Sequence, residues 1–273
     1  MRDEGYLLIA TGAERFVDRA AVAAMSIRAR DGKRPICLLC SPDLLDFAFS
    51  RYSRTFGIIK PVRPPTRPLL GTEYHLFMDQ WTPFKKTLYM DSDCLACSDR
   101  IHDLWDFLDG TDVGICGSKR TSGKWRVDVD AVKRKYGISH VVQNNGGVVY
   151  FESGSQSTEF FATARKLFFG KHPLIQIKHI SGGGIANEPI YAVAMALLGV
   201  EPVQAEMGMN VSTNGIVGCK LRDSSFRVKK RNGKKFDVII AHFLGMDENP
   251  STRSLHFKVQ SYNDKRLLAR SKS

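Results

Sequence analysis

Two acidic residues one position apart follow a short apolar run near the middle of the sequence. The run Leu88-Tyr89-Met90 has the character of a buried strand, and Asp91 and Asp93 come directly after it. In an open α/β sheet, ligands gather beyond the carboxyl ends of the strands. Mg²⁺ and Mn²⁺ take oxygen ligands from one or two carboxylates and the rest from phosphate and water. The sequence therefore predicts a divalent cation at Asp91 and Asp93 that could hold a diphosphate.

The acidic spacing is weak evidence by itself. Asp128 and Asp130 have the same spacing but lie in a basic segment without a strand pattern, where surface charge balance is the simpler role. Asp91 and Asp93 have an alternative role too, which is to cap the turn after the strand. The apolar strand before them and the second apolar step after them favour the metal.

The six cysteines include two pairs with the spacing of a zinc site, Cys37 with Cys40 and Cys94 with Cys97. Each pair encloses apolar residues in or beside a predicted strand, and strand residues three positions apart point to opposite faces. Neither pair would therefore chelate one ion without a turn. We expect buried free thiols in a reducing compartment.

The order of the predicted elements fits an α/β protein with a mainly parallel central sheet flanked by helices. A strand over 6–10 and a helix over about 17–30 form the first half of a nucleotide-binding βαβ unit. Further strands are predicted at 35–40, at 56–60, up to Met90, at 112–117, at 145–151 after a turn, and at 237–241. Further helices are predicted from Ser41-Pro42 onward and at 70–82, 101–108, 158–169 and 189–198, the last capped or preceded by Asn187. Segments 61–68 and 181–184 are predicted loops.

Length and charge suggest one domain with an anionic partner. At 273 residues, without a repeat or clear linker, the chain is expected to form a single domain over 1–273. Its net charge of +12 is concentrated, since 118–135 holds seven Lys or Arg against two Asp, and 219–236 holds eight against one. Such clusters indicate a polyanionic partner, or else two solvated loops. With no run of about 20 apolar residues and no secretion signal visible, we expect a cytoplasmic protein without a transmembrane segment.

Four stretches carry a resemblance to a known family. They are Thr11–Arg28, Lys86–Leu95 with Ile101–Trp105, Asn144–Val148 and Ala241–Gly245. In that order they resemble the first turn and helix, the D-x-D motif with its downstream Leu-Trp, the Asn-x-Gly-Val strand entry and the late His-x-x-Gly of glycogenin-like family 8 glycosyltransferases, which have the GT-A fold. Together they cover most of residues 6–245.

The resemblance implies a single GT-A domain with donor-binding residues in about 1–117, an acceptor side in about 118–256 and a C-terminal tail over 257–273. It implies a metal-dependent hexosyltransferase that uses a UDP-sugar with Mn²⁺ or Mg²⁺ and retains the anomeric configuration. Asp91, Asp93 and His242 would be the metal ligands. Asp91, Asp93, Asn145 and Glu188 would act in catalysis. The donor-binding residues would be Thr11, Phe16, Asp91, Ser92, Asn145, Asn187, Glu188, His242 and Gly245.

Several of these residues have a plainer interpretation without the resemblance. His242 would be a hydrogen-bonded surface histidine at a strand end. Asn145 with Gly146 would form a turn, Phe16 would belong to the core, and Glu188 would support the start of its helix.

The chain also departs from the family pattern. Asn187-Glu188 stands where an acidic residue followed by Gln is usual, and Met246-Asp247-Glu248 replaces the usual Lys-Pro-Trp. The Lys or Arg expected on the helix before the central strand is not evident, and His75 lies nearest to its place. Lys85 or Lys86 is therefore expected to supply the positive charge for the diphosphate.

For the acceptor, the two basic segments suit a phosphate backbone, and Trp125 between two cations suits an unstacked base. We favour a hydroxymethylpyrimidine in DNA, which the enzyme would have to extrude from the duplex. The acceptor-binding residues would be Lys124, Trp125, Arg126, Lys229, Lys230 and Arg231. The main alternative acceptor is lipopolysaccharide or another membrane saccharide, since anionic headgroups also attract lysine. Against it, the segment 257–273 has no convincing amphipathic face.

A different class of function is a non-catalytic nucleic-acid-binding protein on a GT-A scaffold, which would have no use for a metal-ligand trio.

Overall fold

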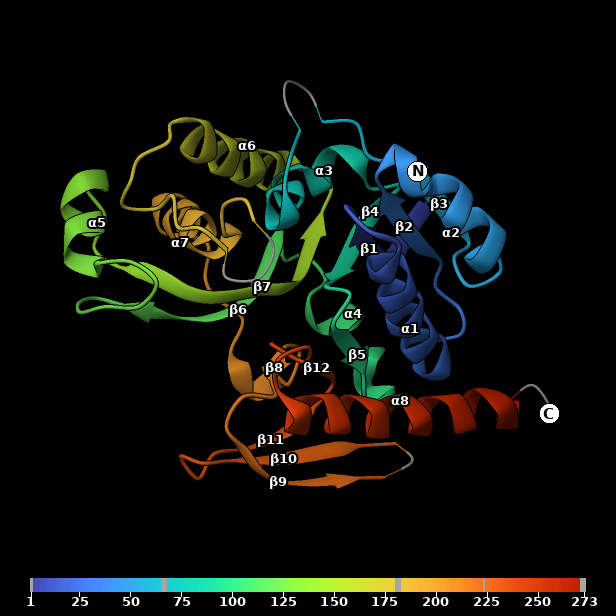
Figure 1. The fold of residues 1–273 in the computed structure, drawn as a ribbon. Coiled ribbons are helices and arrows are strands. Elements are labelled where there is room, and N and C mark those ends of the chain that lie inside the picture. The colour runs from blue at the N-terminus through green and yellow to red at the C-terminus, as the bar shows by residue number, and fades with distance from the viewer. Residues whose placement is uncertain (1, 65–67, 180–182, 223, 271–273) are drawn as a thin grey trace.

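The centre of the molecule is a six-stranded sheet with the strand order β3-β2-β1-β4-β7-β6 (Figure 1). The computed structural model describes residues 2–64, 68–179, 183–222 and 224–270. β1 to β4 pair in parallel, whereas β7 is antiparallel to both β4 and β6. This arrangement confirms the predicted α/β class with a mainly parallel central sheet.

The elements of the described residues follow one another as strands and helices. The strands are β1 Arg2–Ala10, β2 Ile36–Cys40, β3 Ile58–Pro61, β4 Phe84–Met90, β5 Cys94–Ala96, β6 Val113–Arg120, β7 Val141–Glu152, β8 Val211–Ser212, β9 Ile216–Leu221, β10 Phe226–Lys230, β11 Lys235–Val238 and β12 Ile240–His242. The α-helices are α1 Glu14–Arg30, α2 Leu45–Tyr52, α3 Met78–Trp81, α4 Asp103–Phe107, α5 Val129–Tyr136, α6 Ser155–Phe169, α7 Asn187–Leu198 and α8 Pro250–Arg270. Short 3₁₀ helices span Pro42–Leu44, Gly71–Phe77, Asp99–Ile101 and Ala205–Met207.

Helices cover both faces of the central sheet. On β1, Tyr6 and Leu8 pack in a core with α1, α2 and α4, whereas Leu7 and Ile9 pack in a second core with α3, α6 and α7. Figure 1 shows α1 and α2 on one side of the sheet and α3, α6 and α7 on the other. Because successive strand residues face opposite sides and both sides are covered, these strands are apolar along most of their length.

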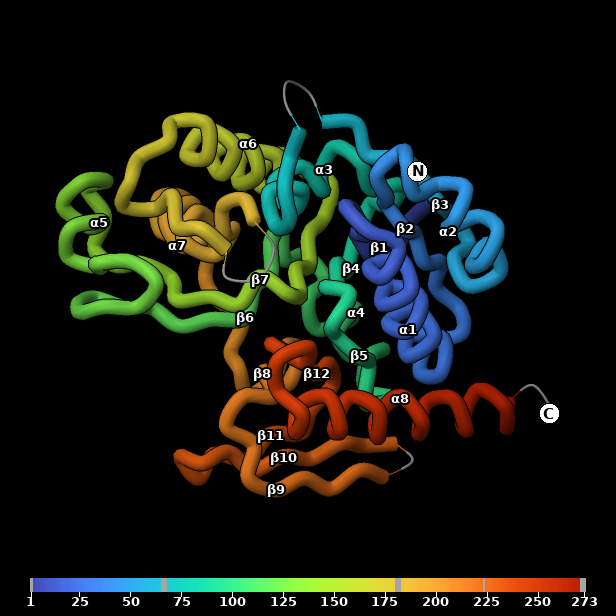
Figure 2. The backbone as a smooth tube through the Cα atoms, viewed as in Figure 1, coloured from blue at the N-terminus to red at the C-terminus, as the bar shows by residue number. Residues whose placement is uncertain are grey.

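Two small sheets extend the fold, one of order β5-β12-β8 and one of order β11-β10-β9. The second sheet packs Phe226, Val228 and Val238 in a core with Val259 of α8. α8 in turn lies beside α1, so the C-terminal helix returns to the N-terminal part of the chain (Figure 2).

The segment expected to be a C-terminal tail is helical as far as Arg270. α8 buries Thr252, His256, Val259 and Asn263, which recur at helical spacing on one face. Asn263 accepts a hydrogen bond from Arg30 Nε (3.1 Å) and donates one from Nδ2 to the carbonyl of Ala96 (3.0 Å). Since most of these buried residues are polar, a search for an apolar stripe does not detect this helix.

One local prediction, and one alternative offered beside another prediction, were wrong. The turn expected at Asn145 lies inside β7 instead, at the point where pairing with β6 is irregular and pairing with β4 begins. The basic segment 219–236 forms most of the β9–β11 sheet instead of loops. In both places strand pairing outweighs the local preference of the residues. Residues 65–67, 181 and 182 of the predicted loops lie outside the described residues.

The cysteines largely match the prediction. Cys37 and Cys40 belong to the cores on opposite faces of the sheet, as the strand geometry required, and burial raises the pKa of Cys37 to about 12. Cys94, Cys97 and Cys116 are also buried free thiols, whereas Cys219 on β9 is exposed. Within the described ranges, no helix combines the length and apolar character needed to cross a membrane.

Candidate active site

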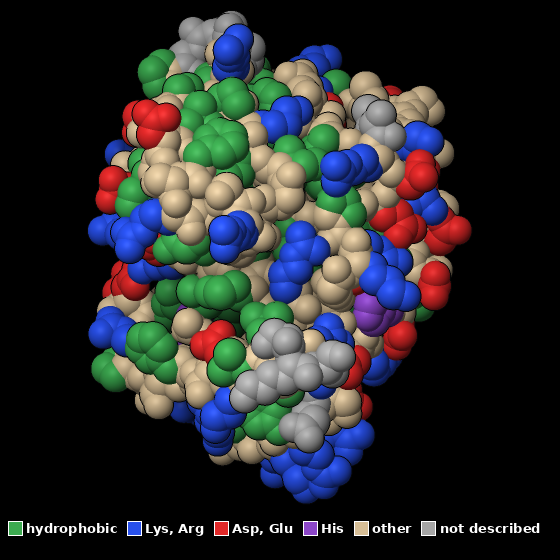
Figure 3. Space-filling view, turned by 90° about the vertical axis from the view of Figure 1, so that its right-hand side faces the viewer, with side chains coloured by type: hydrophobic (Ala, Val, Ile, Leu, Met, Phe, Trp, Pro, Cys, Tyr) green, Lys and Arg blue, Asp and Glu red, His purple; other side chains and the backbone are tan. Residues whose placement is uncertain are grey.

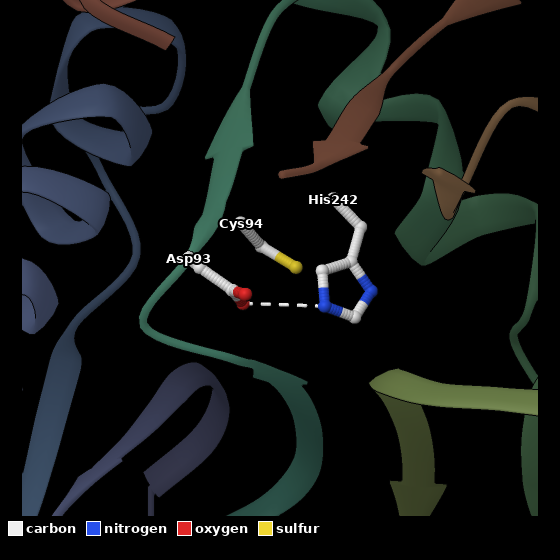
Figure 4. A group of neighbouring side chains, drawn as sticks. All are labelled: Asp93, Cys94 and His242. Carbon is white, nitrogen blue, oxygen red and sulfur yellow. Dashed lines mark ion pairs between the residues drawn. The ribbon is translucent and has the colours of Figure 1, made fainter. Parts of the chain in front are cut away.

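Strand pairing brings His242 to the paired aspartates. β4 ends at Met90, and β5 begins at Cys94 directly after Asp93. β12 pairs antiparallel with β5 so that His242 stands opposite Cys94, and the next residue, Phe243, donates its N–H to the carbonyl of Asp93 (3.0 Å). His242 Nε2 consequently lies 3.2 Å from Asp93 Oδ1 (Figure 4). It also lies 3.7 Å from Asp91 Oδ2.

The other ring nitrogen of His242 faces an amide. Nδ1 lies 3.1 Å from the side-chain oxygen of Asn145, which can only accept a hydrogen bond, so Nδ1 carries the proton. That oxygen also accepts the N–H of Gly147 (3.1 Å), which fixes its position. Nε2 is left to face the two carboxylates. An oriented histidine of this kind is typical of metal ligands, whose second nitrogen is held by a neighbouring acceptor.

The three residues of this site shift one another's pKa values. Burial, followed by the neighbouring Asp93 charge, raises the pKa of Asp91 to about 7. Burial alone would lower the pKa of His242, but the two carboxylates outweigh it and raise this pKa to about 9. Burial would likewise raise the pKa of Asp93, but His242 lowers it. Two carboxylates and one imidazole that face one another at the wall of a cleft are suitable ligands for Mn²⁺ or Mg²⁺.

Cys94 also lies close to this site, since ligand atoms of Asp93, Cys94 and His242 are within 4.8 Å of one another (Figure 4). Its thiol is directed to the carbonyl of Gly147 (3.5 Å), and burial raises its pKa well above the usual range. A protonated thiol is a poor ligand for a hard cation. Asp91, with side-chain exposure of 23%, completes the ligand set better than Cys94 does.

A buried relay behind Asp91 was not predicted from the sequence. Asn187 Nδ2 lies 3.1 Å from His75 Nδ1, His75 Nε2 lies 2.7 Å from the Tyr89 hydroxyl, and that hydroxyl donates to Asp91 Oδ1. Burial lowers the pKa of His75 to about 3, so the ring is neutral and donates from Nε2 to Tyr89. All donors therefore point toward Asp91. Tyr89 was part of the predicted strand, but nothing in its spacing distinguished it from a core residue.

The site opens into a cavity of about 410 Å³ at the carboxyl ends of β1 and β4. Of the residues predicted to bind donor or metal, those that line it are Thr11, Phe16, Asp91, Ser92, Asp93, Asn187, Glu188, His242 and Gly245. Asn145 is placed behind this wall, in contact with His242. Arg15, Arg19 and Arg126 contribute positive charge to the lining.

Glu188 and Asn187 start α7 but do not cap it through their side chains. Asn187 contacts His75 as described, and the residue that precedes α7, Ala186, has no side-chain cap to offer. Glu188 Oε1 accepts a hydrogen bond from Arg126 (3.0 Å), whereas its buried Oε2 has no partner among the described residues. An unpartnered carboxylate oxygen beside a cavity is suited to accept a hydrogen bond from a ligand hydroxyl.

The lysines expected to meet a diphosphate are at the wrong end of the central strand. Lys85 and Lys86 lie at the start of β4, where they pair with Asp3 and Asp109. The predicted metal ligands follow the other end of the same strand, so this expectation is corrected.

The predicted acceptor residues are spread over separate parts of the molecule. Arg126 reaches the cavity, Lys124 is exposed, and Trp125 packs against the core beside α5 and α7. Lys230 donates from Nζ to backbone carbonyls of Ser212 and Asn214. The exposed residues Lys229 and Arg231 belong to the β9–β11 sheet and its turn.

Comparison with known proteins rests on structure. No protein-family model matches the sequence, and no curated protein does either. The crystal structure of the galactosyltransferase LgtC in complex with donor and acceptor sugar analogs superposes with a TM-score of 0.60 at 15% identity, covering 96% of this chain and 95% of LgtC. The chain has the GT-A fold. An active-site mutant of LgtC gives a TM-score of 0.58 at 16% identity, over 88% of this chain and 87% of the mutant. The bifunctional glycosyltransferase WbbM gives 0.50 at 13% identity, over 77% of this chain and 40% of WbbM. The GT-A prediction is thereby confirmed, and at these identities the likeness concerns the fold.

Proposed function

We propose that the protein is a metal-dependent glycosyltransferase that moves a sugar from a UDP-sugar to a hydroxyl acceptor. The observation that carries the proposal is the convergence of Asp91, Asp93 and His242 on the wall of a cavity at the carboxyl ends of the central strands. A pure binding protein would have no use for such a trio. The structural likeness to glycosyltransferases, including one with bound donor and acceptor sugar analogs, supports the same conclusion.

In this proposal, the reaction breaks the bond between the anomeric carbon and the diphosphate and forms a bond from that carbon to the acceptor oxygen. UDP departs, and the proton of the acceptor hydroxyl passes to the departing diphosphate. Mn²⁺ or Mg²⁺, when bound, would neutralise the departing diphosphate as a Lewis acid. Asp91, Asp93 and His242 would hold it, with Asn145 fixing His242 and Tyr89 fixing Asp91. Glu188 Oε2 and Asn187 would face the transferred sugar, and Thr11 and Phe16 the nucleoside. Retention of configuration is proposed from the family resemblance.

For the acceptor, a saccharide hydroxyl is now the first candidate, because the LgtC complex contains an acceptor sugar analog. A modified base in DNA stays a prediction. What favours it is the outer face of the β9–β11 sheet, where Lys229 stands directly opposite Lys235 on the adjacent strand. Opposed like charges on adjacent strands are unfavourable unless an anion lies nearby.

The metal trio is tested by calorimetric titration of UDP in the presence and absence of Mn²⁺. Asp93→Asn and Asp91→Asn should each weaken Mn²⁺-dependent UDP binding by at least about 10-fold, because each removes a charged ligand. Circular dichroism and the melting temperature should change little, since both side chains lie at the cavity wall. Asp106→Asn, at an exposed position of α4, is the matched control. UDP affinity that is equal in wild type and both variants would show that the trio does not hold a metal–diphosphate complex.

A further inference from the structure

Two arginines on α1 line the cavity beside Phe16. The guanidinium groups of Arg15 and Arg19 lie over the ring of Phe16, with carbon-to-centroid distances of 5.0 and 5.6 Å. Both arginines line the cavity together with Asp93, His242 and Gly245. The ring of Phe16 packs against the core below, so it forms a fixed platform for two cations.

Arg19 is held by a carboxylate from the loop that follows His242. Its Nη2 makes an ion pair with Asp247, and the side chains are 23% and 61% exposed. Asp247 comes from the segment 244–249, whose residues Leu244 and Gly245 line the cavity. The exposed carboxylate of Asp247 thus forms an ion pair with the guanidinium group of Arg19 beside the cavity.

A diphosphate in this cavity would lie near three carboxylates, so it needs cations close by. Asp91, Asp93 and Glu188 line the cavity, and Asp247 lies in the loop beside it. The lysines at the start of β4 pair with acidic residues at the opposite end of that strand and cannot contribute. Arg126, the third arginine of the lining, is paired with Glu188. Arg19 is paired as well, but its partner Asp247 is 61% exposed, whereas the side chain of Glu188 is only 14% exposed. The arginines on α1 are therefore the ones that an anion beside the aspartates can engage more readily.

We propose that Arg19, assisted by Arg15, binds the diphosphate of the nucleotide donor and that Asp247 takes the place of this anion when the donor is absent. The proposal rests on the proposed function. A guanidinium group can bind two phosphate oxygens in a fork geometry and is more weakly hydrated than an ammonium group. Donor binding exchanges the carboxylate for phosphate and thereby releases the 244–249 loop from α1. The contact between the 244–249 loop and α1 is therefore present without the donor and absent when the donor is bound.

The experiment compares the affinities of uridine, UDP and inorganic pyrophosphate in the presence of Mn²⁺, measured by calorimetry. Arg19→Gln should weaken UDP and pyrophosphate binding by about 10- to 100-fold, the usual effect of a charge-assisted hydrogen bond, and leave uridine unchanged. Arg19→Lys should fall between the two. Asp247→Asn should strengthen UDP binding by about 2- to 5-fold, because it removes a competing exposed ion pair. Arg51→Gln is the control, since Arg51 also lies over a ring, that of Phe47 on α2, at a site outside the cavity lining.

Whether Asp247→Asn raises or lowers the affinity for UDP distinguishes this proposal from a purely structural role of the Arg19–Asp247 ion pair. If Asp247→Asn weakens UDP binding, or Arg19→Gln lowers uridine affinity as much as UDP affinity, the proposal is overturned. Pyrophosphate binding that Arg19→Gln abolishes, in a protein that binds no nucleotide, would support the anion site and contradict the proposed function alone. Wild-type protein that binds neither UDP nor pyrophosphate would overturn both.

Discussion

Gly147 shows how closely the residues around the candidate metal site are packed. Its carbonyl accepts the N–H of Asp91 (2.7 Å), and a Cβ at this position would overlap His242 Cε1 and Nδ1 and lie 3.1 Å from Asp91 Oδ2. The backbone here supports one ligand while the missing side chain makes room for another. A substitution at Gly147 therefore changes the geometry of the site without changing any ligand.

We expect Gly147→Ala to weaken Mn²⁺ binding in the presence of UDP by about 10- to 100-fold, as loss of ligand orientation usually does. The added methyl group displaces the His242 ring, whereas the main-chain hydrogen bond to Asp91 can persist. Calorimetry with Mn²⁺ measures the effect. Gly218→Ala is the control, because a Cβ at Gly218 on β9 would meet open space. Equal Mn²⁺ affinities in the two variants would mean that the position of His242 is unimportant for the metal.

At the scale of single residues, the sequence indicates those candidate site residues that have a characteristic spacing. Asp91 and Asp93 stand out because a strand precedes them, whereas His242 was predicted as a ligand only from the family resemblance. Tyr89 and Arg19 were missed. Tyr89 contacts His75, 14 positions away, and Arg19 contacts Asp247, 228 positions away, and no spacing in the sequence indicates such contacts.

At the scale of elements, Asp31 joins α1 to β1 and β2. Its carboxylate is fully buried and accepts hydrogen bonds from the Tyr6 hydroxyl (2.9 Å), Arg34 Nη1 (2.9 Å) and the N–H of Lys33 (3.0 Å). Burial alone would raise the pKa of Asp31, but the bonds from Arg34, Lys33 and Tyr6 outweigh it and lower this pKa. The ionised carboxylate therefore stabilises the turn between α1 and β2.

We expect Asp31→Asn to lower the free energy of unfolding at pH 7 by about 2–3 kcal/mol, because the hydrogen bonds to a buried charge are weakened. Since the folded-state pKa lies below the unfolded value of about 3.9, the stabilisation is complete above that value and is lost as the pH falls through the folded-state pKa. The difference between wild type and variant should thus shrink below about pH 4. Urea unfolding across this pH range measures it, with Asp106→Asn as the control. A difference that stays constant down to about pH 2 would argue against the charge.

Helices and strands could be predicted where their buried side chains are apolar and recur at the helix or strand period. β1, α1, β2 and β4 were located within a few residues, because their apolar side chains repeat at the strand or helix period. α8 was not predicted, because its buried face is made of Thr252, His256 and Asn263 beside one valine. Those polar residues are stabilised by partners such as Arg30 and Ala96, which only the tertiary structure brings near.

At the scale of the whole molecule, the net charge of +12 was predicted to mark an anionic partner. Its two sources are separate in the structure, since α5 and the β9–β11 sheet lie on different sides of the molecule (Figure 1). On the face in Figure 3, Lys and Arg side chains are scattered among acidic ones and gather at the lower end. Several basic residues of both segments are already paired, as Lys119 is with Glu201 and Arg227 is with Asp237. The total charge therefore overstates the surface available to a polyanion.

Basic residues without an acidic partner form the surface that could bind a polyanion. The exposed residues Lys229 and Arg231 of the β9–β11 sheet should carry the binding of duplex DNA, because neither has an acidic partner in the described part of the chain and Lys229 stands opposite Lys235. Lys229→Glu with Arg231→Glu should lower DNA affinity and reduce the slope of log K against log salt by about 0.9 for each phosphate that the protein no longer neutralises. Fluorescence anisotropy at several salt concentrations measures both. The control is Lys258→Glu with Lys265→Glu on α8, which removes the same amount of charge at exposed positions elsewhere. If both variants weaken binding equally, net charge alone attracts the DNA and the sheet face has no special role.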